Sequence, residues 1–424
     1  MFKIIKPTEA VNEFLSFLDL DLSKPQQRHL TNFVEALLAC DGTKTIAKLN
    51  RLILDARDQS AFTDFFTYST WDNDAFHQQR NRALLKWVLN MDQGELIPKP
   101  LFISIDDSKS NKPKTSLHFE VVDWHFETNE GRGFGHGVVF VSVHISCGKR
   151  SALLNLKIYL RQKTVRRINR LRQKGERIPF KSKYTITREI LKELVPLIPK
   201  DVPVYVLFDS WYASKKLIKY CRRQGWHVIC ALKHNRLFKP NGKNDFRSLS
   251  RLARYTRTKA FTETIVKTSD SSTRYWAHTK RGCLNEINDE FSMTISKRYH
   301  GDKRPAFFLS TDVSLNAREV LTRYGQRWDV EVDHLYLKVH LGLSDFRLRF
   351  YEGIARYFDL VGLTLTYLQW RKDKEQGADI KCLSDVIAQH RQEQQSQCLR
   401  AFAECVLKKG SVDQALAYWY KQAA

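Results

Sequence analysis

Two aspartates follow apolar segments that have the composition of buried β-strands. Residues 101–105 form an apolar run that leads into Asp106, and residues 202–208 form another that leads into Asp209. In open α/β sheets the reacting groups collect at the carboxyl ends of strands, so two such carboxylates can lie side by side. Aspartate is also common in turns, so each residue alone has an ordinary structural explanation.

A helix predicted over residues 314–340, with Ser314 as its cap, adds a third element. At about 100° per residue, it carries one apolar stripe that would face the core, formed by Leu321, Trp328, Val332, Leu335 and Val339. A second stripe, turned by about 90°, is polar and consists of Tyr324, Arg327, Glu331 and Lys338. We therefore expect Glu331 at the rim of the core, with cations before and after it. The alternative is an ordinary helix pair of Arg327 and Glu331, which stabilises a helix by a few tenths of a kcal/mol.

The polar stripe also carries a resemblance to a known family. In the segment YGQRWDVEVDHLYLK, Tyr324, Arg327, Glu331 and Lys338 have the spacing Y-x2-R-x3-E-x6-K. This spacing resembles that of bacterial insertion-sequence DDE transposases of the cut-and-paste YREK group, which have a ribonuclease-H-like fold. The segments SIDDSK and LFDSWY, around the two aspartates, resemble the aspartate motifs of that group, and LGLSDFRLR resembles its continuation. The resemblance covers about residues 100–370 well, and residues 20–90 more loosely.

This resemblance implies a DNA transposase, an endonuclease and strand transferase that cuts transposon ends and joins their 3′-OH to target DNA. It implies that Asp106, Asp209 and Glu331 are catalytic and hold two Mg²⁺ ions, which Mn²⁺ can replace. Three carboxylates suit this chemistry because one cation generates the nucleophile and the other stabilises the leaving oxygen. Both cations prefer hard oxygen ligands. Asp107, directly after Asp106, stays an alternative ligand.

The other residues of the motif are expected to contact DNA. Arg327 would bind phosphate with its two-nitrogen fork and Lys338 as a point charge, while Tyr324 would lie against the DNA backbone. The implied partners are double-stranded DNA, as element ends and as target, and a second copy of the chain in the DNA complex. Two alternatives remain: a domesticated DNA-binding protein that does not cut, and a ribonuclease-H-like nuclease or resolvase. The three carboxylates argue against the first, and the motif with its β-rich insertion argues against the second.

Positive charge is concentrated in two blocks of the chain, whose formal net charge is +24. Residues 149–200 hold 16 basic and three acidic residues, and residues 213–260 hold 14 basic residues and one acidic residue. Charge concentrated in this way predicts a nucleic-acid-binding face. Residues 157–177 are expected to form a helix that docks on the protein through Val165, Ile168 and Leu171. Its other side would face DNA phosphates with Arg166, Arg167, Arg170 and Lys174.

The surrounding elements predict an α/β fold with a β-rich insertion and with helical N- and C-terminal regions. The resemblance implies that its catalytic core is ribonuclease-H-like and is interrupted by this insertion. Apolar runs predict core strands at residues 101–105, 138–145, 202–208 and 226–232. Helices are predicted between them, at 186–198 and 214–225. Strands that alternate with helices indicate a sheet with crossovers. Short strands without long helices between them indicate the insertion, at 275–278, 291–296 and 307–309.

The expected domains are a helical N-terminal DNA-binding region, two parts of the core that enclose the insertion, and a helical C-terminal region. Their boundaries are 1–95, 96–234, 235–311 for the insertion, 312–349 with the catalytic helix, and 350–424. Near the start, Ser23 and Pro25 predict a helix that ends at the Asp41-Gly42 turn. This helix and the next fit a DNA-reading helix-turn-helix or an ordinary helical bundle equally well. Ser411, three residues before Gln414, predicts the start of the last helix.

Composition excludes several other classes of protein. Eight cysteines without a C-x-x-C pair indicate reduced, buried thiols in a cytoplasmic protein. The resemblance implies that it is associated with the bacterial nucleoid. The longest apolar runs, such as 138–145, are far shorter than the ~20 residues that a membrane-spanning helix needs. His334 is expected on the surface of its helix. The aromatic side chains expected in the core, rather than stacked on unpaired bases, are Trp211, Trp276 and Trp328.

Overall fold

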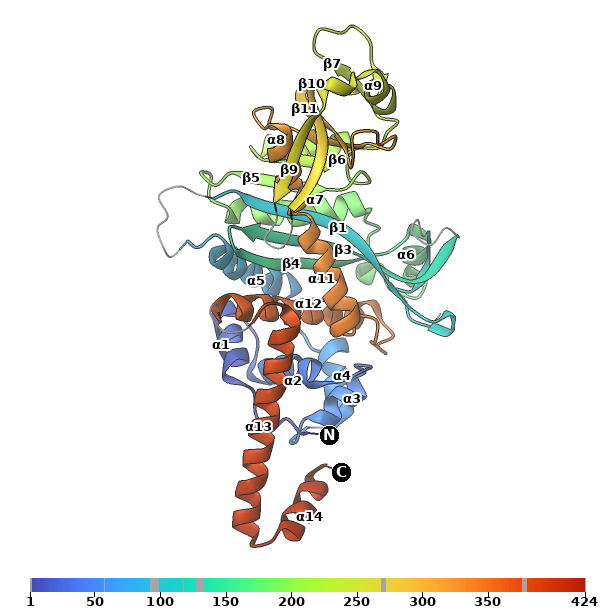
Figure 1. The fold of residues 1–424 in the computed structure, drawn as a ribbon. Coiled ribbons are helices and arrows are strands. Elements are labelled where there is room, and N and C mark those ends of the chain that lie inside the picture. The colour runs from blue at the N-terminus through green and yellow to red at the C-terminus, as the bar shows by residue number, and fades with distance from the viewer. Residues whose placement is uncertain are drawn as a thin grey trace.

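A mixed sheet runs through the middle of the molecule, with helices from both ends of the chain gathered on one side of it (Figure 1). The structure is a computed structural model, and it describes residues 2–56, 58–91, 99–116, 118–126, 133–267, 272–375 and 380–423. Within these ranges the sheet contains 12 strands. The predicted α/β class, with a ribonuclease-H-like core and helical termini, is confirmed.

Five strands form the core of the sheet in the order β4-β3-β1-β5-β6. Strands β1 (Leu101–Asn111), β3 (Phe134–Cys147) and β4 (Arg150–Tyr159) are antiparallel, whereas β5 (Val204–Phe208) and β6 (His227–Ala231) run parallel to β1. Parallel neighbours need a crossover connection, and helices supply it here. All five residues of β5 are buried, which explains why this strand is a continuous apolar run rather than an alternating one.

The crossovers contain the helices α6 (Gln162–Asn169), α7 (Lys183–Leu194) and α8 (Lys215–Arg223). Ser182 caps α7 and Ser214 caps α8, because each side chain accepts a hydrogen bond from a backbone N–H of the first turn. The predicted helices at 186–198 and 214–225 are therefore confirmed, with small shifts of their ends. The expected helix over 157–177 is mostly wrong, since its first residues belong to β4 and α6 ends at Asn169.

The insertion extends the same sheet beyond β6. Strand β12 (Ala306–Ser310) pairs antiparallel with β6, β11 (Ile287–Lys297) with β12, and β10 (Ser272–Leu284) with β11. The outer strands are β7 (Leu237–Pro240), β8 (Arg247–Ser248) and β9 (Thr262–Lys267), with the short helix α9 (Leu249–Tyr255) beside them. The predicted insertion strands are confirmed. Because the hydrogen bonding is continuous from β6 to β12, the division of the chain into domains stays a prediction.

The N-terminal helices and the C-terminal helices pack into one helical body. The first are α1 (Glu9–Leu18), α2 (Lys24–Ala39), α3 (Ile46–Leu52), α4 (Gln59–Thr67) and α5 (Asn73–Val88). The last are α12 (Tyr351–Lys374), α13 (Leu383–Lys409) and α14 (Val412–Ala423). Helix α2 packs on both α12 and α13, and α5 and α12 pack on β4. Helix α13 extends away from the sheet, and α14 folds back along α13 (Figure 1).

The predicted helix ends in the N-terminal region are confirmed. Ser23 and Gln26 form a capping box at α2, and Thr45 caps α3 by accepting from the N–H of Lys48. Helix α2 is buried on most of its circumference over residues 30–38, with a charged residue, Glu35, among the buried side chains. This burial favours the helical bundle over a helix-turn-helix that projects α2 and α3 toward DNA.

The predicted helix at 314–340 is divided into three pieces. Helix α10 (Ala317–Gly325) is followed by α11 (Trp328–Leu335), which continues as a π-helical turn over Tyr336–His340. The cap is Asn316, which forms a capping box with Glu319, so the assignment of Ser314 is wrong. Ser314 instead donates both its N–H and its hydroxyl to Asp312, which keeps it in the turn before the helix.

Candidate active site

Asp106 and Asp209 lie next to each other on neighbouring strands. Ile105 is opposite Phe208 in the parallel pair of β1 and β5, and the next residue of each strand is the aspartate. Strand β5 ends there, whereas β1 continues to Asn111 along β3. The prediction that the first strand ends at Asp106 is therefore wrong, but its pairing with β5 does end there. Because β1 and β5 separate after this point, the sheet is open where the carboxylates of Asp106 and Asp209 lie.

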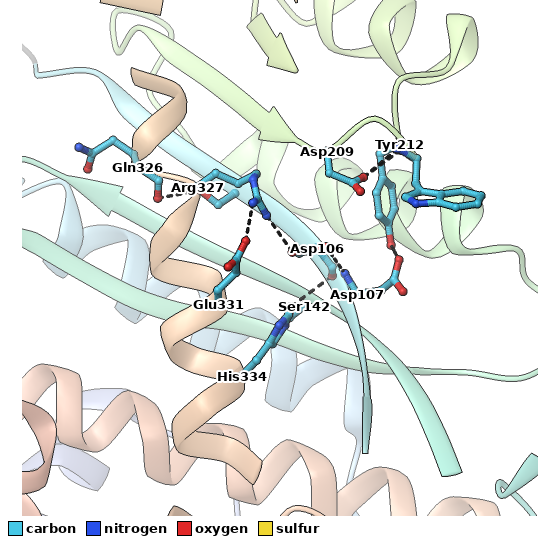
Figure 2. A network of polar contacts seen from close by, with 11 residues as sticks. Asp106, Asp107, Ser142, Asp209, Tyr212, Gln326, Arg327, Glu331 and His334 are labelled. Carbon is cyan, nitrogen blue, oxygen red and sulfur yellow. Dashed lines mark hydrogen bonds and ion pairs between the residues drawn. The ribbon is translucent and has the colours of Figure 1, made fainter. Parts of the chain in front are cut away.

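Asp107 has different partners from Asp106. Its carboxylate accepts a hydrogen bond from the hydroxyl of Tyr212 at 2.9 Å (Figure 2). It also accepts one from the ammonium of Lys183 at 2.6 Å. Successive residues of a strand point to opposite faces of the sheet, and Asp106 faces α11 instead. These contacts favour Asp106 over Asp107 as the aspartate that faces Glu331.

Burial changes the ionisation of both Asp106 and Asp209. Burial raises the pKa of Asp106 to about 6, although the guanidinium of Arg327 and the N–H of Asp107 oppose this change. Burial also raises the pKa of Asp209, whose carboxylate accepts from the N–H groups of Trp211 and Tyr212 at 2.9 and 3.4 Å. Carboxylates whose pKa is raised by burial are typical of functional sites.

Arg327 connects Glu331 to Asp106. One nitrogen of its guanidinium donates to Asp106 Oδ2 at 2.8 Å, and the other donates to Glu331 Oε1 at 2.5 Å. Figure 2 shows the side chain reaching from the start of α11 between the two carboxylates. The helix pair of Arg327 and Glu331 therefore exists, but it also includes Asp106, 221 residues earlier in the chain.

The remaining residues of the motif lie around the same site. Lys338 donates from its ammonium to the hydroxyl of Ser108, two residues beyond Asp106 on β1, and burial lowers the pKa of this lysine. Tyr324 packs against Phe308, with 4.7 Å between ring centroids, and burial raises the pKa of its hydroxyl to about 12. The four motif residues and the two aspartates are thus near one another in the fold.

The orientation of α11 differs from the expected one. The stripe predicted to face the core is largely exposed: Trp328 is 63% exposed, Val339 is 66% exposed, and only Leu321 of the five is buried. The residues that α11 buries instead are Val330, Asp333 and His334. Hydrophobic periodicity predicted the wrong face because two of the buried positions are polar and find polar partners on the sheet.

Asp333 and His334 attach α11 to strand β3. The carboxylate of Asp333 lies 2.6 Å from His144 Nδ1 and accepts from Gln369 of α12 at 2.7 Å. His334 Nε2 lies 2.6 Å from the hydroxyl of Ser142, which also donates to the backbone carbonyl of Asp106 at 3.2 Å. The expectation that His334 lies on the helix surface is wrong, since it is buried.

These contacts fix the ionisation of the two histidines in opposite directions. Burial lowers the pKa of His334 to about 3, so this ring is neutral. Burial opposes the charge of His144 as well, but the carboxylate of Asp333 outweighs burial and raises the pKa of His144. Sequence reasoning missed Ser142 and His144, although polar residues two apart in an otherwise apolar strand are a recognisable signal.

Comparison with protein families identifies the superfamily. A family model described as DDE superfamily endonuclease matches residues 18–270, which is more than half of the chain. The chain belongs to the DDE superfamily of endonucleases. A second model, described as transposase DDE domain, matches residues 181–368. No curated protein matches the chain. The DDE endonuclease is therefore a metal-dependent enzyme of the transposase type, and its substrate is DNA.

The donor atoms of the site are of the type that binds a divalent metal ion, but the side chains are not arranged to hold one. Asp106, Asp209 and Glu331 offer the carboxylate oxygens that Mg²⁺ and Mn²⁺ prefer. In the ranges that the structure describes, however, no group of three or more His, Cys, Asp or Glu side chains is arranged to hold a metal ion. The guanidinium of Arg327 lies between two of the three carboxylates and supplies the positive charge there.

The basic residues predicted to bind DNA lie on α6 and after it. Arg166, Arg167 and Arg170 are exposed on the DDE endonuclease, and Arg167 also donates to the carbonyls of Glu120 and Val122 at 2.9 and 3.1 Å. The docking face of this helix is confirmed for Val165 and Ile168, which are buried. It is wrong for Leu171, which is 92% exposed because the helix has already ended.

Two of the three tryptophans expected in the core are exposed. Trp211 follows Asp209 by two residues, and the ammonium of Lys233 lies 3.7 Å from the centre of its ring. Trp328 follows Arg327, and only Trp276 is partly buried against the core. The prediction of core positions is therefore wrong for Trp211 and Trp328.

All eight cysteines are free thiols. Five of them are buried as predicted, whereas Cys283 and Cys405 are only partly buried and Cys382 is exposed. Over the residues described, no helix combines the length and the apolar composition that crossing a membrane requires.

Proposed function

We propose that this DDE endonuclease is a bacterial insertion-sequence transposase of the YREK group, which cuts transposon ends and joins their 3′-OH to target DNA. The observation that carries the proposal is the convergence of Asp106, Glu331 and Arg327, with Asp209 on the adjacent strand. A merely structural Arg–Glu pair on a helix would not require a buried aspartate from a distant strand. The spacing of the motif and the two family matches support the same proposal.

In this proposal Asp106, Asp209 and Glu331 hold two Mg²⁺ ions, which Mn²⁺ can replace. When bound, such ions activate the attacking oxygen and stabilise the leaving oxygen of the phosphodiester. The hydroxyl of Ser142 donates to the backbone carbonyl of Asp106 and also bonds to His334 on the helix of Glu331. It therefore holds this backbone and this helix in a fixed relation. Asp333, His144 and Gln369 fix the same helix on its buried side.

The cations of the site would bind the DNA backbone. Arg327 presents a planar fork that matches a phosphate, and Lys338 adds a compact charge from the π-helical turn. Tyr324 is held beside Arg327, with 5.6 Å between the guanidinium carbon and the ring centre. Arg166, Arg167 and Arg170 would extend the contact along duplex DNA. The helical region 1–95 would bind DNA, and two copies of the chain would act together on the nucleoid in the cytoplasm.

The deciding experiment uses the DNA that flanks the gene. The purified chain is incubated with Mg²⁺ and a plasmid that carries both flanking segments, and released fragments and joined products are separated on gels. We expect release of the segment between terminal inverted repeats and its joining to a second plasmid. Binding without cleavage would favour a domesticated DNA-binding protein, and cleavage only of branched DNA or hybrids would favour a resolvase or nuclease.

Glu331→Gln separates chemistry from DNA binding in this assay. The substitution keeps the size and helix propensity of the side chain but removes a negative charge that faces DNA. We expect cleavage to be lost while binding to end DNA, measured by fluorescence anisotropy, is equal or tighter. A folded Glu331→Gln protein that still cuts with Mg²⁺ would contradict the assignment of Glu331.

A further inference from the structure

Arg327 neutralises the carboxylates that the proposed function assigns to metal binding. Its two terminal nitrogens bond to Asp106 and Glu331, and its side chain is only 13% exposed. Its third nitrogen, Nε, is buried and makes no hydrogen bond within the residues described. The two carboxylates therefore accept the hydrogen bonds of the guanidinium, and its third nitrogen adds none.

The other charged groups nearby are satisfied in ways that leave this pairing undisturbed. Lys338 donates to the hydroxyl of Ser108, and Lys183 pairs with Asp107. Asp209 accepts from two backbone N–H groups. Arg327 is thus the side chain that bridges a strand carboxylate and the helix carboxylate, and it takes the position that shared cations would otherwise have.

Metal and Arg327 cannot use these oxygens together. A guanidinium stays positive at every pH that a protein tolerates, so it cannot leave by losing its proton. A divalent cation on the same oxygens would face a like charge at close range, in surroundings that screen it poorly. Arg327 therefore weakens cation binding while it is bonded to Asp106 and Glu331, and cation binding is stronger once this side chain has moved away.

A DNA phosphate offers Arg327 an equivalent partner. The fork of a guanidinium bonds a phosphate in the same two-point way as it bonds carboxylates. Arg327 stands at the junction of α10 and α11, where the helix is interrupted, and Glu331 is 34% exposed in its side chain, so the pair can be reached from solvent. Moving the fork to a phosphate would free Asp106 and Glu331 at the moment when DNA is present.

We propose that Arg327 is an internal counter-ion that makes divalent-cation binding depend on DNA. In the free enzyme Arg327 is bonded to Asp106 and Glu331. In the DNA complex it bonds to a backbone phosphate instead. Because linkage is reciprocal, the cation must tighten DNA binding by the same factor by which DNA tightens cation binding. This inference rests on the proposed function, in which the three carboxylates hold the metal.

The test measures Mn²⁺ binding directly, by electron paramagnetic resonance of the unbound ion and by calorimetry. The full chain is titrated alone and with a duplex oligonucleotide at concentrations that anisotropy shows to be saturating for each variant. The variants are Arg327→Ala and Arg327→Met, of which the second keeps the stem beside Tyr324. The matched control is Arg318→Ala, which removes the same charge from an exposed position of α10. Circular dichroism confirms that each variant is folded.

In the wild type we expect DNA to tighten Mn²⁺ binding by about tenfold or more, within the usual range of coupling between sites. Both Arg327 variants should bind Mn²⁺ without DNA about as tightly as the wild-type DNA complex does, and DNA should add little further. Arg318→Ala should behave as the wild type. Equal DNA-free affinities in wild type and Arg327→Ala, or full coupling in that variant, would overturn the inference.

Failure of the proposed function gives a different result. Asp106→Asn and Glu331→Gln are titrated in parallel, and both should weaken Mn²⁺ binding in the presence of DNA. If they do not, or if no variant binds Mn²⁺ with or without DNA, the metal site itself is wrong and the inference falls with it. If they do and Arg327 has no effect, only the counter-ion role is wrong.

Discussion

Helices α11 and α12 are consecutive helices of the chain and both contact the core sheet, but they are attached to it in different ways. Helix α12 buries every residue from Tyr357 to Arg371, mostly apolar ones, and packs against β4. Two polar side chains of α12, Thr366 and Gln369, add hydrogen bonds to the backbone of Leu153. Helix α11 buries an aspartate and a histidine, each bonded to a polar residue of β3. Apolar packing is non-directional, whereas hydrogen bonds have narrow geometry. The helix that carries Glu331 is thus held by contacts that fix its rotation as well as its position.

The largest effect should come from removing the buried carboxylate of α11. Asp333→Ala removes the carboxylate 2.6 Å from the buried ring of His144 and leaves only that of Asp329, at 3.8 Å. It should lower the free energy of unfolding by about 3–5 kcal/mol, as for other broken buried pairs. Cleavage by the folded fraction should also be lost, because Glu331 is no longer fixed. Urea denaturation and cleavage assays measure the two effects, and Asp333→Asn serves as the milder variant if Asp333→Ala does not fold.

A substitution of similar cost in α12 should spare the chemistry. Phe358 is fully buried and lies 6.0 Å from Phe140 of β3, measured between ring centroids. Phe358→Ala should destabilise the protein by about 3–5 kcal/mol through the cavity it leaves. Cleavage per folded molecule should change little. If Phe358→Ala and Asp333→Ala lose activity equally at equal stability, the two attachments do not differ in the proposed way.

Ser142→Ala should have a smaller effect on stability and a clear effect on activity. It removes the hydroxyl that links His334 to the backbone of Asp106 and should cost about 1 kcal/mol of stability. Residues that orient metal ligands typically change metal affinity or activity by about 10–100-fold. Ser142→Thr, which keeps the hydroxyl, should restore most of the activity. Unchanged cleavage by Ser142→Ala would remove this residue from the positioning role.

The polar attachment of α11 should also depend on pH. The folded-state pKa of His144 is raised, so its contribution is complete below its unfolded value of about 6.5 and is lost as the pH rises through the folded value. The groups that face it are the carboxylates of Asp333 and Asp329. The wild type should therefore lose more stability than His144→Gln between neutral and alkaline pH. Parallel stability curves would show that His144 is neutral when buried.

The smallest effect is expected on the exposed apolar stripe of α11. Trp328→Ala should change the free energy of unfolding by no more than about 0.5 kcal/mol, as usual for surface positions. A thermal melt compared with that of the wild type measures it. A loss of 2 kcal/mol or more would show that Trp328 is buried and that the stripe docks as its periodicity predicts.

The sequence by itself determined the elements and their order. Apolar runs located β1, β3, β5 and β6, and the capping residue Ser23 with Pro25 located the start of α2. The spacing of the motif placed Arg327 and Glu331 in one site. These features depend on residues close together in the chain. The ribonuclease-H-like core was predicted from the resemblance of the motifs to a known family, which the order of two Asp-bearing strands, a β-rich insertion and a Glu-bearing helix supported.

Only the tertiary structure decided which face of α11 is buried and what Arg327 contacts. Periodicity assigns the apolar face to the core, but Asp333 and His334 bury in its place because His144 and Ser142, about 190 residues earlier, satisfy them. A local pattern cannot show a partner that the fold brings from so far away. For the same reason the motif predicted that Arg327 faces DNA, whereas folding brings Asp106 within 2.8 Å of it. Buried polar groups are favourable only when paired, and the pairing belongs to the fold.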